Sequence, residues 1–371
     1  MRKPDTDIEI KLNPMGINLI PITDSEKWDN IVCSFKEYDV YYLSGYVKTF
    51  QQHGDGDPVL FYYNVDDLRG INVVMKRDLS SFENFTGLIP QGEYFDIVTP
   101  YGYGGFLFEG NISEKNLIEF NEKYEDFLRK KNIVSEFVRF HPLLRNADNM
   151  RTISNVIDLG STIHLHLDSL ETIWKNISSK NRNTIRKAQK NGVEIVHGKD
   201  LSLFKNFMEI YNKTMMLDNA LPYYYFKEDF YQSIHQDLYD NYEMFYALHN
   251  DEIIAMSIVL YGNGFMHYHL SGSLYEYRNL SPTNLLLYKA ACWGASGNLS
   301  SFHLGGGLGS GEDNLYKFKK TFNREDSGST QFSIGKRIVD QDMYSKLVEM
   351  RIKEDSSFDV DSSFFPLYRS I

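Results

Sequence analysis

Hydrophobic and polar positions in the first half of the chain alternate between the period of a strand and that of a helix. Two short runs rich in β-branched and aromatic residues, Val59–Tyr63 and Ile71–Met75, predict strands joined by a tight turn. Apolar residues at helical spacing predict a helix over Lys115–Lys131. A strand is predicted at Val134–Phe140, stopped by Pro142. This order is typical of an α/β or α+β module.

The second half repeats the same order of elements with a longer helical beginning. Its first predicted helix, Leu170–Asn191, ends at Gly192, a residue type that favours helix ends. The elements predicted after it are a strand at Val193–Val196, helices at Leu201–Leu217 and Phe226–Leu238, strands at Phe245–Leu248, Ile253–Tyr261 and Gly264–Leu270, a helix at Thr283–Ala295 and a strand at Ser301–Leu304. We therefore predict one α/β module used twice, with mixed central sheets flanked by helices and a boundary near Asp158–Leu167.

Composition supports two folded domains and excludes several classes of protein. The 371 residues leave room for two cores, and the 15% aromatic content excludes disorder as the main state. The net charge of −11 disfavours a duplex DNA partner. Cys33 and Cys292 are the two cysteines and lack metal-type spacing, so we expect no metal, no disulfide and a reducing compartment.

The sequence also shows no targeting signal that would change this view. The amino-terminal residues include cations but no apolar core of a signal peptide, and no run of 18 apolar residues occurs. We expect a cytoplasmic protein.

A cationic run, Lys175–Lys190, is the first motif that suggests chemistry. It carries six cations and no acid, with apolar residues along one edge. Such a surface can bind the phosphates of a nucleotide, a tRNA or a lipid head group, although charge runs are often simply solvated helix faces. The candidate anion-binding residues are Lys180, Arg182, Arg186 and Lys187.

A glycine-rich stretch, Gly305–Gly311, follows the last predicted strand and lets backbone amides approach an anion or a substrate closely. It is no nucleotide-binding Walker A loop, because no Gly-Lys-Ser/Thr follows, and a flexible connection remains an alternative. Directly after it, Phe318 and Phe322 lie four residues apart, so one helical turn would bury both and direct Lys319 away from that buried face. Lys319 could stabilise an oxyanion beside the glycines, or it could be a surface lysine.

Three further stretches hold candidate binding residues. On the strand around Tyr268, strict alternation would place His267 and His269 on one face, where packing is favoured over a metal. In the first half, Tyr101 and Tyr103 lie in a Tyr-Gly loop that could contact a ligand or form a structural turn. Arg139 and His141 stand at a strand end, where they could enter a cleft or pack.

Motifs of several common enzyme classes are missing. No Gly-x-Ser-x-Gly nucleophile elbow, kinase signature or His-Glu-x-x-His motif occurs. A serine hydrolase or a zinc protease is therefore disfavoured.

Taken in order, these motifs resemble the Fem family of peptidoglycan-bridge aminoacyltransferases, which consist of tandem domains of the GNAT acyltransferase fold. The segments that carry the resemblance are Ile185–Val193, Tyr268–Ser273, Gly305–Gly306 after its strand, Leu315–Lys319, Arg139–Pro142 and Tyr101–Gly105. The similarity covers most of residues 30–335. It implies an armless monomer with domains at 1–160 plus 336–371 and at 161–335.

The resemblance also implies roles for single residues. Lys319 occupies the position of the family's lysine that stabilises the charged transition state, and Lys48 lies near one that contacts the acceptor diphosphate. His141 stands where a familiar member has an acidic residue, and tyrosines replace an arginine near residue 224. We take Lys319 and His141 as candidate catalytic residues. The candidate substrate-binding residues are Lys48, Tyr101, Tyr103, Arg139, Tyr224, Tyr225, Tyr268, His269, Gly306 and Phe318.

Two enzymatic hypotheses follow, together with a third in which the fold serves as a non-catalytic binding module. The first is transfer of an aminoacyl group, from aminoacyl-tRNA, onto an amine of a nucleotide- or lipid-linked cell-envelope precursor, with peripheral contact at the inner membrane surface. The second is a CoA-dependent N-acyltransferase acting on an amino sugar or polysaccharide precursor. Arg278–Thr283 stands where GNAT proteins have a glycine turn for CoA, but it lacks both glycines, and Pro282 removes a backbone donor. In both cases the donor is a cosubstrate, and no bound cofactor is expected.

Overall fold

Two groups of strands and helices divide the chain into units, which are described separately. The computed structural model describes residues 16–370. The first unit comprises the chain up to Leu159 together with Phe332 onward, and the second comprises Gly160–Gln331. The boundaries fall within strands β7 (Val156–His166) and β13 (Ser329–Ile338).

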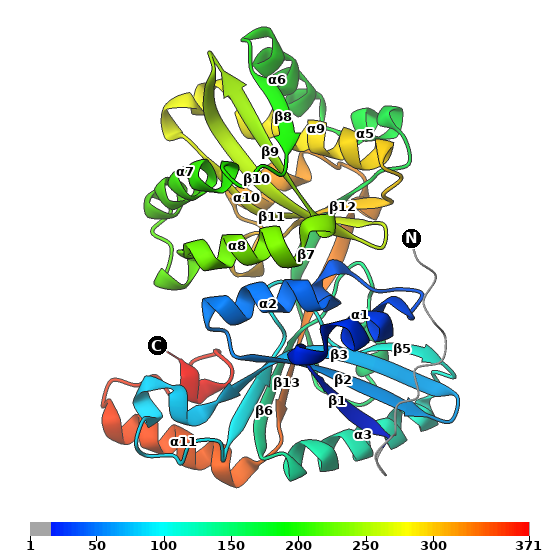
Figure 1. Cartoon of the computed structure of the whole chain (residues 1–371), viewed down its shortest axis with the longest axis vertical. Helices are drawn as coiled ribbons and strands as arrows, with labels where there is room; N and C mark the ends of the chain where they lie inside the picture. The colour runs from blue at the N-terminus through cyan, green and yellow to red at the C-terminus, as the bar shows by residue number, and fades with distance from the viewer. Residues whose placement is uncertain (1–15, 371) are drawn as a thin grey trace. The chain divides into compact units, whose positions relative to one another are not determined.

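The first unit is a mixed sheet with helices on both faces. Its sheet has the order β1-β2-β3-β4-β6-β13, and β5 pairs with β3 beside this path. Helices α1 and α2 lie on one face, and α3 and α11 lie on the other (Figure 1). The remaining elements of this unit are β1 (Ile17–Pro21), α1 (Ser25–Cys33), α2 (Ser44–His53), β2 (Asp57–Val65), β3 (Leu68–Asp78), β4 (Phe95–Val98), β5 (Leu107–Gly110), α3 (Glu114–Lys130), β6 (Ile133–Arg139), α4 (Ala147–Met150) and α11 (Gln341–Glu354).

An aromatic core fixes α3 on its sheet. The buried positions of this helix, Leu117, Phe120, Tyr124, Phe127 and Leu128, recur at the predicted helical spacing. They pack with residues of β2 and β5 in one cluster, where aromatic rings meet edge to face and add to the burial of apolar surface. The predicted helix and the strands predicted at Val59–Tyr63, Ile71–Met75 and Val134–Phe140 are confirmed.

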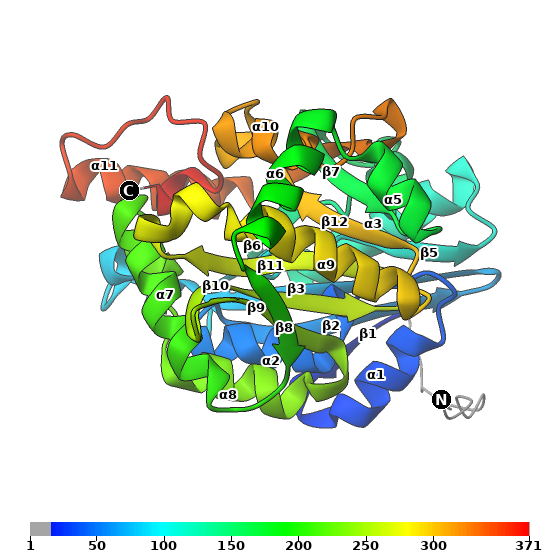
Figure 2. The same cartoon turned by 90° about the horizontal axis from the view of Figure 1, so that it is seen from above.

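The second unit has the same plan. Its sheet order is β7-β12-β11-β10-β9-β8. Helix α9 packs on one face of this sheet with α6 beside it (Figure 2), and α7 packs on the opposite face against β10 and β11. The further elements are α5 (Leu170–Asn176), α6 (Ser179–Lys190), β8 (Glu194–Gly198), α7 (Leu203–Leu217), α8 (Glu228–Asp237), β9 (Tyr242–His249), β10 (Glu252–Gly262), β11 (Phe265–Ser273), α9 (Pro282–Ser296), β12 (Ser301–Gly305) and α10 (Asn314–Lys320).

One predicted helix of this unit is wrong. The helix expected over Leu170–Asn191 is two helices, because the chain leaves the helical conformation at Ile177, whose ψ is 134°. The side chain of Ser178 then caps α6 by accepting a hydrogen bond from the Asn181 amide. The amide of Ser178 bonds outside the helix, to the Thr321 carbonyl at 2.9 Å.

Both units contain one parallel strand pair that stays together only briefly. In the second unit, β11 pairs with β12 from Phe265 to His267, which is a third of β11. In the first unit, β4 pairs in parallel with β6, while β5, which continues the chain after a loop, pairs with β3 instead. In the second unit, backbone groups beyond the point of divergence are released from the ladder, so ligands and side chains can approach the sheet there. In the first unit, the Gly104 amide continues the pairing with β6 by donating to the Arg139 carbonyl.

Candidate functional site

The glycine loop after β12 is closed by one carboxylate. Gly305 adopts a φ of +78°, and a Cβ on Gly307 would lie 2.2 Å from the Gly311 carbonyl oxygen, so both positions require glycine. The Asp313 carboxylate accepts a hydrogen bond from the Leu308 amide at 3.0 Å. The loop is therefore an ordered turn fixed to the residue that precedes α10.

Asp313 also begins α10. Its second oxygen accepts the Tyr316 amide at 2.8 Å, the usual hydrogen bond of a helix N-cap. This bond, together with the one from Leu308, lowers the pKa of Asp313. The same carboxylate thus connects the glycine loop with the helix that carries Lys319.

Lys319 is buried rather than exposed. Its residue is 8% accessible, and its Nζ donates a hydrogen bond to the Gly306 carbonyl at 2.6 Å. Burial lowers the pKa of Lys319 to about 8, and the Asp313 charge opposes this shift. The expectation that Lys319 would point away from the buried side of its helix is wrong.

The two phenylalanines beside Lys319 also pack inward. The Phe322 ring is fully buried and meets the half-buried Phe318 edge to face at 5.4 Å, as the four-residue spacing predicts. Lys319 therefore shares its turn with aromatic core residues, and the surface-lysine alternative does not hold.

Within residues 16–370, the Gly306 carbonyl is the one acceptor that the Lys319 ammonium bonds. An ammonium has three N–H donors, and one of them goes to Gly306. With a pKa of about 8, about nine-tenths of the molecules carry the charge at pH 7. A buried cation with unused donors beside a glycine loop can stabilise an oxyanion that develops on a substrate.

A chain of hydrogen bonds positions the end of α10. The buried Asn181, on α6, donates from Nδ2 to the Thr321 hydroxyl at 2.9 Å and accepts from the Asn284 amide group at 2.8 Å. The Thr321 hydroxyl in turn donates to the Phe318 carbonyl at 2.6 Å. Helix α6, the start of α9 and the end of α10 are therefore joined through the side chain of Asn181.

The predicted cations on α6 divide into two kinds. Arg182 is half-buried and donates from Nη1 to the carbonyls of Trp174, Lys175 and Ile177, at the end of α5. Lys180, Arg186 and Lys187 are exposed. Arg186 lies over the Trp174 ring and also donates to Asn183. Among residues 16–370 no carboxylate forms a salt bridge with these three exposed cations, so the surface keeps its positive charge.

Tyr268 and His269 lie where the β11 register shifts. Val259 pairs with Tyr268 and Ile258 with Leu270, so the register skips His269. This bulge breaks the strict alternation from which a common face for His267 and His269 was predicted. Burial raises the pKa of Tyr268 to about 12 and lowers that of His269 to about 3.

Tyr224 and Tyr225 follow α7 in this unit. Tyr224 closes the turn Pro222–Tyr224, and both tyrosines are half-buried. The rings of Tyr223 and Tyr224 meet edge to face at 5.4 Å. The structure thus leaves part of each predicted tyrosine accessible.

In the first unit, Arg139 organises the Tyr-Gly loop. Its guanidinium donates to the carbonyls of Thr99 (3.1 Å), Pro100 (2.8 Å) and Gly102 (3.1 Å). Tyr101 and Tyr103 flank Gly102, so one side chain fixes the loop that carries both. Arg139 itself is half-buried.

His141 is completely buried next to this loop. Its Nδ1 accepts the Leu144 amide at 3.2 Å, and its Nε2 lies 3.1 Å from the Asp39 carboxylate. An Nδ1 that accepts carries no proton in the neutral ring, so Nε2 bears the hydrogen that faces Asp39. The Tyr103 ring lies 5.8 Å from the imidazole.

Lys48 lies on α2, the helix that packs on the same loop. It is half-buried, and its charge opposes the effect of burial, which raises the pKa of Asp29 on α1. Phe50 of the same helix stacks on Tyr101 at 5.4 Å.

The predicted residues therefore form two groups, each within one unit. The first unit gathers Tyr101, Tyr103, Arg139 and His141, with Lys48 on the adjoining helix. The second unit gathers Gly306, Phe318 and Lys319. Sequence reasoning missed Asp39, Asn181 and Asp313. For Asp313, an acidic residue just before a helical pattern is an available N-cap signal.

Comparisons with known proteins agree with this architecture. Residues 178–320 match the family described as an acetyltransferase (GNAT) domain. No curated protein sequence matches the chain. Among solved structures, FemX superposes with a TM-score of 0.64 at 14% identity, covering 89% of this chain and 99% of FemX. A conserved protein of unknown function from Bacteroides thetaiotaomicron VPI-5482 gives 0.55 at 10% identity, covering 86% and 99%.

At such low identity the structural similarities concern the fold, which is α/β with mixed sheets flanked by helices, as predicted. The described residues include no helix long and apolar enough to cross a membrane. The domain match identifies the second unit as an acyltransferase domain, the enzyme class predicted from the motifs. Residues 178–320 thus carry the sequence signature of the acetyltransferase (GNAT) family, and the chain as a whole has the fold of FemX, as its resemblance to Fem proteins predicts.

Proposed function

We propose that this acyltransferase moves an aminoacyl group from charged tRNA onto an amine of a cell-envelope precursor. The observation that carries the proposal is the buried Lys319 ammonium, held on the Gly306 carbonyl beside an ordered glycine loop. The resemblance to the Fem family supplies the donor and the acceptor, and the Phe318-Lys319 pair is its most specific element.

The proposed reaction needs little more than positioning and charge stabilisation. A neutral acceptor amine attacks the ester carbonyl of the aminoacyl donor, and the C–N bond forms as the carbonyl oxygen becomes an oxyanion. The ester C–O bond then breaks, and the proton lost by the amine is balanced by the proton gained by the ribose oxygen. Lys319 would donate to the oxyanion, which such groups stabilise by about 3–4 kcal/mol when they are preorganised.

Two features of the second unit favour tRNA as the donor over acyl-CoA. The turn before α9 has Ser281 in the left-handed region (φ 54°) and Pro282 at the first helical position, so the usual row of backbone donors for a diphosphate lacks one member. The exposed cations of α6 offer positive charge with no carboxylate partner among the described residues, as binding of a phosphate backbone requires.

An acyl-CoA-dependent N-acyltransferase is the second candidate. It is favoured by the match of residues 178–320 to a family described as an acetyltransferase domain. In this case the same lysine would stabilise the oxyanion of a thioester, and the acceptor would be an amino sugar or a polysaccharide precursor.

The decisive experiment is a donor screen with the purified protein. Radiolabelled aminoacyl-tRNAs and acyl-CoAs are offered with amine acceptors, including lipid- and nucleotide-linked envelope precursors, and transfer is measured. We expect transfer from tRNA and none from acyl-CoA. The reverse result would establish the second candidate.

The role of Lys319 is tested with a neighbour on the same helix as control. Lys319→Ala is expected to lower transfer by about 100- to 1000-fold, whereas Lys317→Ala, at an exposed position of α10, is expected to retain it. Undiminished transfer by Lys319→Ala would remove this residue from the mechanism.

A further inference from the structure

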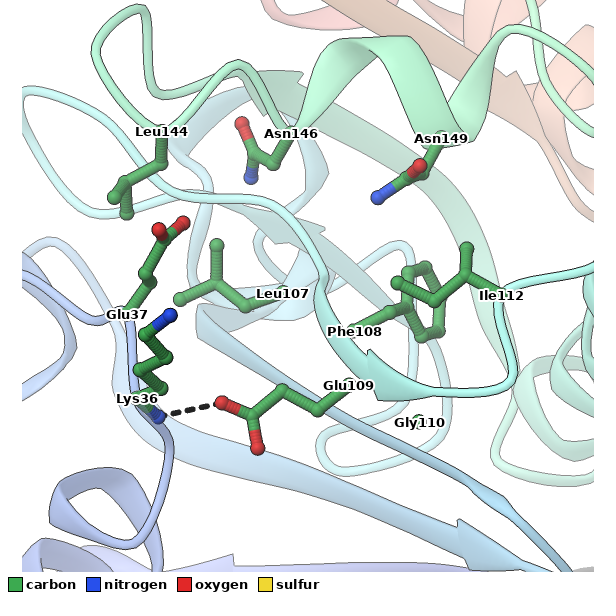
Figure 3. Close-up of a pocket in the computed structure, with 10 residues that line it drawn as sticks. All are labelled: Lys36, Glu37, Leu107, Phe108, Glu109, Gly110, Ile112, Leu144, Asn146 and Asn149. Atoms are coloured by element: carbon green, nitrogen blue, oxygen red, sulfur yellow. Dashed lines mark hydrogen bonds between the residues drawn. The ribbon is translucent and has the colours of Figure 1, made fainter.

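A cavity lies in the first unit, along the strand β5. Its volume is about 520 Å³, within the usual range of ligand sites. Figure 3 shows Leu107, Phe108 and Glu109 of β5 on one side and Leu144, Asn146 and Asn149 on the other. None of these is among the residues that the motifs singled out.

The edge of β5 that is not paired with β3 carries unused backbone groups. The Asn111 amide donates to the Asp67 carbonyl, which continues the β3–β5 register. Because hydrogen-bonded residues alternate along an antiparallel strand, the backbone groups of Glu109 and Leu107 also point toward β3. Phe108 and Gly110 therefore direct their amides away from β3. The Phe108 N–H and C=O have no partner among residues 16–370, and Gly110 offers its N–H.

Side chains around this edge provide apolar surface and charged groups of both signs, because Lys36 lines the cavity as well as Glu37. Glu109 is neutralised by Arg69 at 2.5 Å. The exposed Glu37 carboxylate, in contrast, forms no ion pair within the described part of the chain, and the Asn149 amide forms no hydrogen bond there. Ile112 is 40% exposed and contributes apolar lining at the end of the strand.

We propose that this cavity binds an extended peptide segment that adds to β5 as a further strand and directs a cationic side chain toward Glu37. A peptide supplies a donor and an acceptor on every second residue of one edge, which matches the spacing of Phe108 and Gly110. Small apolar molecules would leave these backbone groups unsatisfied, at a cost that buried amides rarely bear.

The charge distribution also separates a peptide from an anionic ligand such as the diphosphate arm of CoA. The helix that follows β5 begins with Glu114, and its first turn is already capped by Ser113. An unpaired carboxylate at Glu37 attracts cations. The inference is independent of the proposed acyl transfer, because it rests on groups in the other unit.

The experiment uses labelled five-residue peptides of the sequence Ala-Leu-Lys-Val-Ala with blocked ends, and measures binding by fluorescence anisotropy with the full chain. Two further versions carry N-methyl groups on alternate amides, so that each removes the donors of one peptide edge. We expect submillimolar binding of the parent, retained by one version and weakened at least tenfold for the other. Hydrogen exchange should show protection of the Phe108 and Gly110 amides.

Variants of the exposed lining test the site without disturbing the fold. Glu37→Lys is expected to weaken peptide binding at least tenfold, and Ile112→Asp should also weaken it. Glu122→Lys, an exposed charge reversal on α3, should leave binding unchanged. No binding at 1 mM, equal binding of both methylated versions, an unaffected Glu37→Lys variant, or binding of acetyl-CoA that excludes the peptide would each overturn the proposal.

Discussion

The strand ends of β6 and β12 occupy equivalent places in the two units but use their basic groups in opposite ways. At the end of β6, the Arg139 guanidinium donates to three backbone carbonyls and fixes a loop. After β12, the Lys319 ammonium donates to one carbonyl, that of Gly306. The guanidinium uses three of its five N–H donors to hold its own loop, and the ammonium uses one of its three within the described residues.

The choice of residue type suits these two tasks. A guanidinium presents its donors in a rigid fork and stays charged, which suits the holding of several carbonyls. An ammonium is compact and its pKa responds to burial, here to about 8. The contrast suggests that chemistry takes place in the second unit while the loop of the first unit is a scaffold, and the following predictions test this division.

The largest effect is expected for Lys319→Met. Transfer should fall by about 100- to 1000-fold, the usual loss when an oxyanion donor is removed. The folded protein should at the same time become more stable by about 1–3 kcal/mol near neutral pH, because a buried ammonium is replaced by an apolar chain of similar length. Activity is measured by transfer and stability by urea unfolding.

The sign of the stability change follows from the pKa of Lys319. Its folded value of about 8 lies below the ordinary 10.5, so the unfolded chain binds the proton more tightly. The buried ammonium therefore lowers the stability of the wild-type fold by its full amount below pH 8. This effect fades between pH 8 and 10.5 and is absent above pH 10.5. A stability gain that persists unchanged at pH 10.5 and above would contradict this account.

The next effect concerns the pH dependence of transfer. If Lys319 stabilises the oxyanion as a cation, kcat should fall above its pKa of about 8, approaching tenfold per pH unit. The measurement is a single-turnover pH profile of the wild-type protein, with Lys319→Met as control, in which this descending limb should be missing. A rate that rises through pH 8 would instead indicate that Lys319 acts as a base.

A smaller effect is expected for Asn181→Ala. This change removes the side chain that joins α6, α9 and α10, so Lys319 would lose part of its alignment while substrate contacts remain. We expect kcat to fall about 5- to 10-fold with little change in KM. The pH above which kcat declines, about 8 in the wild-type protein, should also shift. Asn183→Ala, at an exposed position of the same helix, is the matched control.

Much of the fold could be predicted because its longer elements have strong periodicity. The α3 helix and the strands β8 to β12 follow from apolar spacing and turn residues, whereas β7 was missed, because its residues were taken as the boundary between the two modules. Strands β4 and β5 have four residues each, too few for a clear pattern, and were missed. The break between α5 and α6 depends on a contact between Ser178 and Thr321, which no local pattern reveals.

The candidate site was predictable to a different degree for each residue. Lys319 could be chosen from its place after a glycine loop, but its burial and its bond to Gly306 depend on how α10 packs. Asn181 was not found, because its partner Thr321 lies 140 residues away. The bulge that displaces His269 from the predicted alternation likewise arises from pairing with β10.

The smallest effect on activity is expected for Arg139→Gln in the first unit. The loop would lose charge-assisted hydrogen bonds to buried carbonyls, so the free energy of unfolding should fall by about 2–3 kcal/mol. Transfer by the folded protein should fall less than tenfold, because Arg139 holds a loop rather than the reacting atoms. Arg145→Gln, an exposed arginine paired with Asp148, should change stability by under about 0.5 kcal/mol. A loss of transfer above 100-fold at unchanged stability would place Arg139 against the substrate, and the division between a scaffold loop and a reactive lysine would then fail.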